Sequence, residues 1–350
     1  MEQNKVEFIV PESLNGKRAD LIISSLLSDI SRSKVKAWIE GGHILVNGLS
    51  VSPRKKLLTG ENIIVCFQPD DKELQFEPEN LDLDIIYKDN DIAVINKPAG
   101  LVVHPAEGNW SGTLLNGLLH HFPLNRSLPR AGIVHRLDKD TSGLLVIALN
   151  NFSQQELVKQ LQNKTVYREY RALVWGDIAN PGTINEPIGR HPKNRIKMAV
   201  NNINGKNSVT HFEVIENFTY HTYIKCILET GRTHQIRVHL QFNKTPIVGD
   251  QIYGYKKIIS IKNSSSEHIS KVINFGRQAL HAKKLGLVHP KTNLKMSWNT
   301  KIPNDFMSLL KSASKLNTQQ KINIDHNDEQ NYENYADSHD DFHNYEIDDD

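Results

Sequence analysis

The chain has 350 residues, of which 38% are hydrophobic and 23% charged, so it is long enough for two domains and too apolar to be disordered throughout. Its formal net charge of +2 conceals an acidic end: residues 318–350 contain eleven Asp and Glu against one Lys, which leaves residues 1–317 at +12. A basic body favours a polyanionic partner such as nucleic acid, and no apolar run approaches the roughly 20 residues of a membrane span. The N-terminus also lacks the apolar core of a signal peptide, so we expect a cytoplasmic protein.

Residues 1–67 form the first predicted domain. Apolar side chains at helical spacing predict helices over residues 21–27 and 35–39, and the Gly pair at 41–42 ends the second one. Short apolar runs at 44–46 and 63–65 predict strands. Cations gather at the start of the second helix, which is compatible with a surface that contacts a polyanion, although an ordinary solvated basic face explains them equally well. These cations are Arg32, Lys34 and Lys36.

Residues 68–81 are polar, acidic and contain proline, and we predict a linker there. Strands dominate from residue 82, with few helices between them, which predicts an α+β domain with a mixed sheet over residues 82–317. The predicted strands are 84–87 and 92–95 as a hairpin, 166–175, 212–215 and 223–228, and the predicted helices are 151–162 and 233–242, the latter with Thr233 as N-cap. Residues 318–350 show no apolar periodicity and are predicted to be disordered.

The strongest candidate for chemistry is the segment 135–143, HRLDKDTSG, which is followed directly by an apolar run. Ionisable groups beside a buried strand cost desolvation energy unless they pair. A nucleophilic carboxylate must stay ionised, and a fixed cation offsets the rise in pKa that burial causes. Arg136 or Arg237 could serve Asp138 in this way, since Arg237 shares a predicted helix face with His234. The alternative is that Asp138 merely caps a turn and pairs with Arg136.

The sequence offers no pattern typical of a metal site. Cys66 and Cys226 both lie in apolar runs and are expected to be reduced core thiols. The histidine pairs at 120–121 and at 234 and 239 have neither the HExxH spacing nor a supporting cysteine pair. We therefore expect no metal ligands.

Several motifs, in order along the chain, resemble the RluA family of pseudouridine synthases, which act on ribosomal and transfer RNA. The likeness lies in residues 96–105, 135–144, 168–172, 231–240, 247–254 and 277–282. Residues 18–20, 31–48 and 60–61 likewise resemble the S4 RNA-binding domain. The resemblance implies an S4-like α/β domain at 1–67, a linker at 68–81 and a pseudouridine synthase domain with a mixed, mainly antiparallel sheet at 82–317. No segment of the family corresponds to the tail at 318–350.

The resemblance also implies roles for individual residues. Asp138 would attack the target uridine, Arg237 would pair with Asp138, and Tyr170 would pack on the uracil ring. Arg136 would help to fill the stack that the flipped uridine vacates. The residues expected to grip RNA are Arg32, Lys34, Arg190, Lys193, Arg195 and Lys197. The implied partner is a hairpin loop of large-subunit (23S) ribosomal RNA or the assembling large subunit. The resemblance further implies that the protein is a monomer, uses no cofactor and binds no membrane.

Two other functions are compatible with parts of this pattern. An RNA-binding or ribosome-assembly factor with an inactive synthase fold would be expected to lack Asp138, Tyr170 or Arg237, and all three are present. A nucleoside hydrolase would use a similar carboxylate but would release free base.

Overall fold

The computed structural model describes residues 5–27, 30, 32–66, 76–105, 109–194, 197–255 and 266–316, and the tail predicted to be disordered lies outside them. The chain divides into two compact units. Unit 1 comprises residues 1–139, 145–166 and 286–296, and unit 2 comprises residues 140–144, 167–285 and 297–350. Within the described ranges, no helix combines the length and the apolar character needed to cross a bilayer.

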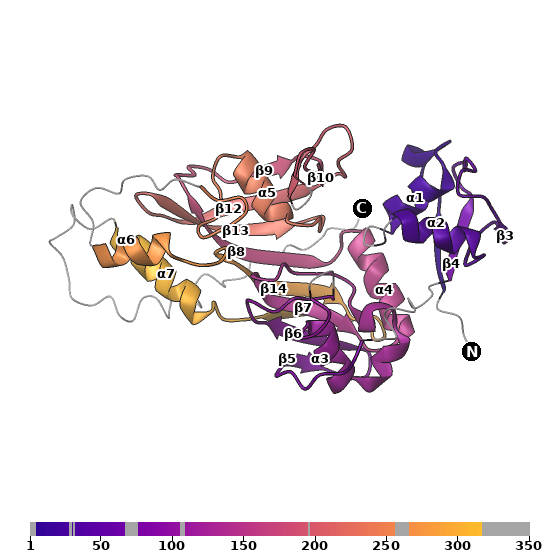
Figure 1. Ribbon diagram of the computed structural model, residues 1–350, viewed down its shortest axis with the longest axis horizontal. Helices are drawn as coiled ribbons and strands as arrows, with labels where there is room; N and C mark the ends of the chain where they lie inside the picture. Colours follow the sequence, from indigo (N-terminus) through magenta and orange to yellow (C-terminus); the bar gives the residue numbers. More distant parts are fainter. Residues whose placement is uncertain are drawn as a thin grey trace. The chain divides into compact units, whose positions relative to one another are not determined.

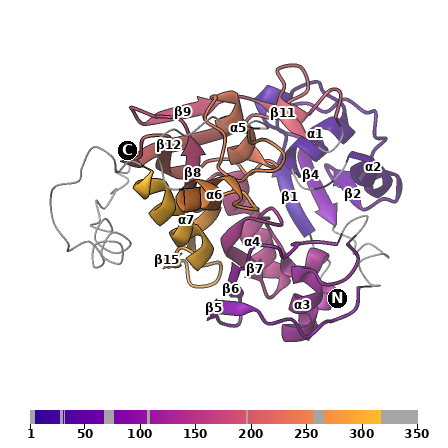
Figure 2. The same ribbon diagram turned by 60° about the vertical axis from the view of Figure 1, so that its left-hand side comes forward.

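The N-terminal part of unit 1 has a core of its own. Strands β1 (Lys5–Ile9), β4 (Asn62–Cys66), β2 (Ile44–Val46) and β3 (Leu49–Ser50) form an antiparallel sheet in that order. Helices α1 (Ala19–Leu26) and α2 (Arg32–Glu40) pack together beside this sheet, as Figures 1 and 2 show. The core includes Ile22, Ile23, Val35, Trp38 and Ile39.

Both predicted helices and both predicted strands of this region are confirmed. The buried face of α1 differs slightly from the expectation, because Ile22 and Ile23 are buried whereas Leu21 is exposed. Strand β1 was not predicted, because a five-residue strand with a single buried side chain, Val6, carries little apolar signal.

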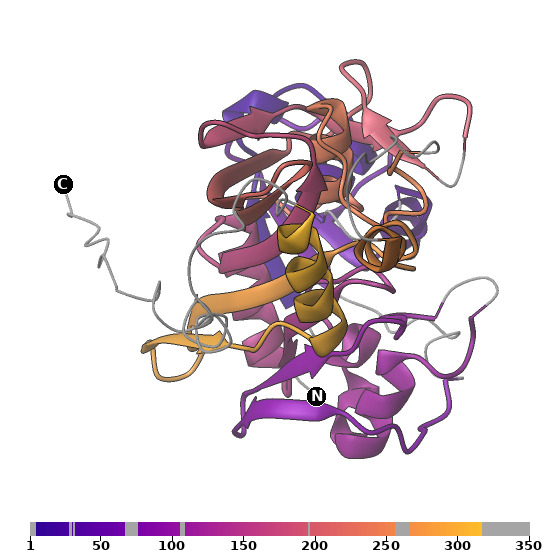
Figure 3. The same cartoon turned by 90° about the vertical axis from the view of Figure 1, so that its left-hand side faces the viewer.

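The rest of unit 1 begins with a hairpin of β5 (Asp84–Lys88) and β6 (Ile92–Lys97), as predicted. Helix α3 (Leu114–His121) and the 3-10 turns η3 (Pro123–Ser127) and η4 (Pro129–Gly132) follow. The hairpin and α3 are drawn in purple at the bottom of Figure 3. Helix α4 (Asn151–Gln162) is confirmed, and the Asn150 side chain caps it by accepting a hydrogen bond from the Ser153 backbone N–H.

The segment predicted as linker is packed at its C-terminal end. Phe76 is buried and stacks on Trp110, and the Glu79 carboxylate accepts hydrogen bonds from the Gly112 backbone N–H. The Asn116 side chain of α3 donates to the Glu77 carbonyl at 2.8 Å. Residues 76–81 are therefore fastened to the α3 region, which their polar composition does not reveal.

Unit 2 is built on a sheet in the order β14-β8-β13-β12-β9, in which the pairs β8·β13, β13·β12 and β12·β9 are antiparallel. Its strands are β8 (Tyr167–Trp175), β9 (Gly182–Asn185), β12 (Val209–Asn217), β13 (His221–Leu228) and β14 (Leu280–Val288), with β15 (Lys295–Asn299) paired to β14. A separate hairpin joins β10 (Ile188–Arg190) and β11 (Met198–Val200). Helix α5 (Gln235–Phe242) is seen beside β12 in Figure 1, and α6 (Ser266–Ile273) and α7 (Asn304–Lys315) lie next to each other.

Strand β7 (Ser142–Ala148) follows the candidate segment, and every one of its residues is buried. A strand buried on both faces reads as a continuous apolar run, which explains the sequence after Gly143. The first residues of β7 pair with β14 in parallel, while the other strand pairs whose register is described are antiparallel. The predicted mixed, mainly antiparallel α+β fold is thus confirmed.

Candidate active site

Asp138 lies in the loop between η4 and β7, and the loop alternates between buried and exposed side chains. Leu137 is buried, Asp138 is half-buried and Arg136 is exposed. The imidazole of His135 accepts a hydrogen bond from the Val146 backbone N–H at 3.0 Å, which fastens the start of the loop to β7. The loop therefore anchors itself through its apolar and histidine side chains and leaves Arg136 in solvent.

Lys97, at the end of β6, holds the residue that follows Asp138. Its side chain is fully buried, and its ammonium donates hydrogen bonds to the carbonyls of Pro98, Leu101 and Lys139 at 2.8, 2.9 and 2.8 Å. The Gly100 backbone N–H donates to the same Lys139 carbonyl at 2.9 Å. A buried cation is tolerated only when hydrogen bonds replace its hydration, and here the loop carbonyls do so. Lys97 thus positions the Asp138 loop.

The sequence contains a signal for Lys97 that the motif reading did not use. A lysine that ends an apolar strand directly before Pro-Ala-Gly, as in residues 92–100, has little chance of reaching solvent and must find acceptors nearby.

Replacing Lys97 with Met removes the three hydrogen bonds while keeping most of the side-chain volume. We expect the free energy of unfolding to fall by about 1–3 kcal/mol, because the loop carbonyls lose their donor. We expect kcat to fall roughly 10- to 100-fold, because a small displacement of a reacting group has an effect of that size. Urea unfolding and single-turnover kinetics measure the two effects. Lys291→Met, at an exposed lysine of the same unit, is the control, and equal behaviour of both variants would refute the role.

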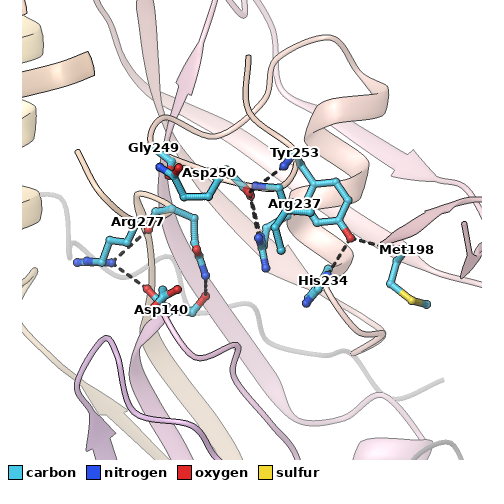
Figure 4. A network of polar contacts seen from close by, with 12 residues as sticks. Asp140, Met198, His234, Arg237, Gly249, Asp250, Tyr253 and Arg277 are labelled. Atoms are coloured by element: carbon cyan, nitrogen blue, oxygen red, sulfur yellow. Dashed lines mark hydrogen bonds and ion pairs between the residues drawn. The ribbon is translucent and has the colours of Figure 1, made fainter. Parts of the chain in front are cut away.

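The residues after Asp138 are held by the segment 277–282. Arg277 donates from Nη1 to the Asp140 carbonyl at 3.2 Å, and its guanidinium is fixed by a two-point ion pair with Asp305 at 2.7 and 3.0 Å. The Gln278 side chain donates to the Thr141 hydroxyl at 3.1 Å. Figure 4 shows Arg277 reaching the backbone of Asp140. The conformation of residues 140–141 therefore depends on a segment more than 130 residues away in the sequence.

The same segment contacts Ser142 and Gly143 through His281 and Ala282. The Ser142 hydroxyl and His281 Nδ1 share a hydrogen bond of 2.9 Å. Burial, aided by the nearby Lys283 charge, lowers the pKa of His281 to about 3, so this imidazole is neutral near pH 7. Gly143 has a φ of +113°, and a Cβ there would lie 2.2 Å from the Ala282 carbonyl oxygen. Only glycine lets β7 approach β14 this closely.

Arg237 lies in α5 and is almost fully buried. Its Nε and Nη2 donate to the two carboxylate oxygens of Asp250 at 2.7 and 2.9 Å. Burial alone raises the pKa of Asp250, but the hydrogen bonds and charge of Arg237 and the backbone N–H groups of Tyr253 and Ile252 outweigh it, so the pKa lies below the ordinary value. The Arg237 guanidinium also lies 5.0 Å from the centre of the Tyr253 ring. Figure 4 shows this arrangement, which the sequence reading missed. The predicted pairing of Arg237 with Asp138 stays a prediction.

The start of α5 differs from the expectation. Thr233 was predicted as the N-cap, but His234 occupies that position in the left-handed conformation, with a φ of 58°. The Gln235 side chain accepts a hydrogen bond from the Arg232 backbone N–H instead. The predicted shared face is confirmed, because His234 hydrogen-bonds the Tyr253 hydroxyl at 2.8 Å while Arg237 lies against its ring.

Tyr170 is a buried residue of β8, opposite Cys226 of β13. Cys226 is buried in β13, as expected of a core thiol, whereas Cys66 at the end of β4 is only half-buried. Stacking of Tyr170 on a uracil ring stays a prediction.

The predicted RNA-binding cations of unit 2 have different surroundings. Arg190 ends β10 and Lys193 lies in the following loop, and both are exposed. Lys197 points inward, donating from Nζ to the Ile252 carbonyl at 2.6 Å and lying 5.7 Å from the Tyr253 ring centre. Arg195 lies outside the described residues. Of the described three, Arg190 and Lys193 are thus the better placed for phosphates.

The two predicted cations near the N-terminus also take part in local packing. Arg32 donates to the buried Asp20 carboxylate at 2.9 and 2.8 Å, and Arg18 donates to the same group at 3.0 Å. Burial by itself raises the pKa of Asp20, but the hydrogen bonds and charges of Arg32 and Arg18 outweigh it, so the pKa lies below its ordinary value. Arg32 therefore joins α1 to α2 while half of its side chain remains exposed. Lys34 lies 5.3 Å from the centre of the Trp38 ring.

One group of side chains has the spacing of a metal site, namely Asp89, Asp91 and His289. Its atoms are engaged in structural bonds: Asp89 accepts from His289 and from the Asp91 backbone N–H, and Asp91 accepts from Asn150. These bonds connect the β5–β6 turn to the start of α4, which accounts for the cluster without an ion.

Comparison with known proteins finds two family models that match separate parts of the chain. A family model described as RNA pseudouridylate synthase matches residues 91–242, and a model of the S4 domain matches residues 17–63. A ribosomal large subunit pseudouridine synthase D from Neisseria meningitidis serogroup B is 46% identical over 310 residues, covering 88% of this chain and 82% of that protein. The protein of the same name from Salmonella typhimurium is 47% identical over 302 residues, covering 86% and 92%. That from Buchnera aphidicola subsp. Acyrthosiphon pisum is 50% identical over 300 residues, covering 85% and 95%.

The fold has counterparts among solved structures. Human RNA Pseudouridylate Synthase Domain Containing 4 matches with a TM-score of 0.51 and 24% sequence identity, covering 65% of this chain and 92% of that one. At this identity the match speaks for the fold alone. Residues 190–192 and 198–200, together with the preceding S4-like domain, resemble ribosomal large subunit pseudouridine synthase D in particular, and the names of the relatives above confirm this likeness.

Proposed function

This chain belongs to the family of RNA pseudouridylate synthases, which makes it an isomerase, and on that premise we propose that it converts specific uridines of large-subunit (23S) ribosomal RNA to pseudouridine. The observation that carries the proposal is the 46–50% identity, over 85–88% of the chain, to relatives named ribosomal large subunit pseudouridine synthase D. The S4 domain supports an RNA substrate, and the +12 charge of residues 1–317 suits a polyanion.

Asp138 is the proposed nucleophile. Its carboxylate attacks the ribose carbon that carries the base while the bond between ribose and base breaks. The freed uracil turns, and one of its ring carbons bonds to the same ribose carbon and displaces the carboxylate. The uracil carbon loses a hydrogen and the released ring nitrogen gains one, so the composition of the RNA does not change. Arg237 keeps Asp138 ionised and oriented, and Tyr170 packs on the uracil so that the detached base stays in place.

A uridine stacked in RNA is out of reach of a carboxylate, so the enzyme must flip it out at a cost of a few kcal/mol. Arg136 is exposed beside Asp138 and would occupy the vacated stack. Arg190 and Lys193, with Arg32 and Lys34 of the S4 domain, would hold phosphates meanwhile. Unstacked bases are most accessible in loops, so we place the target in a hairpin loop, either in free RNA or in the assembling subunit. We further propose that the protein acts as a monomer and that it acts in the cytoplasm.

Mapping pseudouridine in ribosomal RNA tests this function directly. Cells that lack the gene should lose pseudouridine at defined large-subunit positions, while small-subunit positions stay unchanged as the internal control. The purified protein should restore the same positions in RNA from those cells, with no free uracil detected by chromatography. Identical maps with and without the gene would remove the substrate assignment, and stoichiometric release of uracil would indicate a hydrolase instead.

A further inference from the structure

The Tyr253 side chain forms hydrogen bonds both to the β10–β11 hairpin and to the start of α5. The Tyr253 hydroxyl accepts a hydrogen bond from the Met198 backbone N–H of β11 at 2.8 Å and shares another with His234 Nδ1 at the start of α5, also at 2.8 Å. Tyr253 is 3% exposed, while its partners Met198 and His234 are half-buried. Figure 4 shows the hydroxyl between Met198 and His234.

The ring of Tyr253 connects the same two elements a second time. The Arg237 guanidinium of α5 lies 5.0 Å from the ring centre, and the Lys197 ammonium, next to β11, lies 5.7 Å from it. Cations over a shielded aromatic ring are attracted to it electrostatically. A small apolar core of Ile188 from β10, Val238 from α5 and Tyr253 underlies these polar contacts.

The backbone of the Tyr253 turn is in turn fixed by the partner of Arg237. Asp250 Oδ1 accepts from the backbone N–H groups of Ile252 and Tyr253, each at 2.9 Å, while Asp250 binds Arg237 through both carboxylate oxygens. Lys197 closes the ring of contacts by donating to the Ile252 carbonyl. Any displacement of the hairpin is therefore transmitted through Tyr253 to Arg237.

We propose that Tyr253 is a positioning residue that couples phosphate contacts made by the β10–β11 hairpin to the orientation of Arg237. This inference rests on the proposed function, because it assigns Arg190 and Lys193 of the hairpin to the RNA and Arg237 to the reaction. RNA bound by the hairpin holds it on Tyr253, and Tyr253 with Asp250 holds the guanidinium in its working orientation. Removing the hydroxyl uncouples the two.

Tyr253→Phe tests this coupling, because it keeps the ring and its contacts with both cations and removes the hydrogen bonds to Met198 and His234. We expect the KM for the RNA to rise about three- to tenfold and kcat to fall by a similar factor, the size expected for losing a hydrogen bond. Arg190→Ala weakens the proposed phosphate contact of the hairpin, so it should raise KM and, through the coupling, lower kcat by less than Tyr253→Phe does, because Lys193 remains. Tyr255→Phe is the matched control, since its exposed hydroxyl merely donates to the Lys244 carbonyl, and it should behave as wild type.

The double variant separates coupling from simple loss of stability. If the hairpin acts through Tyr253, the rise in KM caused by Arg190→Ala should shrink in the Tyr253→Phe background, whereas a merely structural role predicts independent, multiplying effects. The salt dependence of RNA binding should also flatten in Tyr253→Phe, because fewer phosphates are neutralised. The inference would be overturned if the effects of the two substitutions on KM simply multiplied, or if the salt dependence of RNA binding were unchanged in Tyr253→Phe. It would also be overturned if the kcat of Tyr253→Phe equalled that of Tyr255→Phe. If wild-type protein converts no uridine in large-subunit RNA, the proposed function itself has failed.

Discussion

Purified Asp138→Asn protein is expected to convert no uridine while binding the same RNA with nearly unchanged affinity. The amide is close in size to the carboxylate but cannot act as the nucleophile, so the rate should fall by at least ~10³-fold, as it does when other enzymes lose a nucleophile. Tritium release or mass-spectrometric detection of pseudouridine measures the reaction, and a filter-binding titration measures the affinity.

Asp140→Asn is the matched control for this substitution. Asp140 lies two residues further along the same loop, and the group that Arg277 holds is its backbone carbonyl, which the substitution does not alter. We expect Asp140→Asn to keep most of the activity. Conversion of uridine by Asp138→Asn, or equal loss in both variants, would show that the nucleophile is assigned to the wrong residue.

Replacing Asp250 with Ala should cause the largest loss of stability, about 3–5 kcal/mol in the free energy of unfolding. The substitution leaves the Arg237 guanidinium, whose side chain is 5% exposed, without the carboxylate that compensates its charge. It also removes the acceptor for two backbone N–H groups of the following turn. Urea unfolding monitored by tryptophan fluorescence measures the change.

Two comparison variants show whether burial is the reason for this loss. Asp305→Ala breaks the ion pair with Arg277, whose side chain is 11% exposed but keeps its hydrogen bonds to the Asp140 and Gln278 carbonyls; because Asp305 is 49% exposed, water can take its place, and a smaller loss of about 1–2 kcal/mol is expected. The double variant Asp250→Ala with Arg237→Met should be more stable than Asp250→Ala alone, because the unpaired charge is gone. Equal losses for Asp250→Ala and Asp305→Ala, or a double variant less stable than Asp250→Ala, would contradict the explanation.

The same ion pair predicts a dependence on pH. The pKa of Asp250 lies below its ordinary value of 3.8 in the folded state, so the pair contributes its full stability above that value and loses it as the pH falls through the folded pKa. The difference in stability between wild type and Asp250→Ala should therefore narrow in acid and stay constant near neutral pH.

Local patterns predicted those parts of the structure that depend on neighbouring residues. The 3.6-residue spacing in 151–162 and the two short apolar runs around residues 88–91 correspond to α4 and to the β5–β6 hairpin. The helix at 233–242 was predicted with the wrong cap, because apolar spacing carries no information about the left-handed conformation of His234. Lys197 was predicted to grip RNA because it lies among other cations in the sequence; its hydrogen bond to the Ile252 carbonyl could not be read from that pattern, and its contact with RNA stays a prediction.

The sequence by itself determined the mixed α+β class, through residue types at short, regular separations, and the family, through several motifs in order along the chain; the same resemblance makes Asp138 the proposed nucleophile. Tertiary structure alone decided what surrounds that residue: the burial of Lys97 among loop carbonyls, the contact of Arg277 with Asp140, and the placing of Arg237 between Asp250 and Tyr253. Such contacts join atoms far apart along the chain, and their energies depend on desolvation, which exists only once the chain has closed around them.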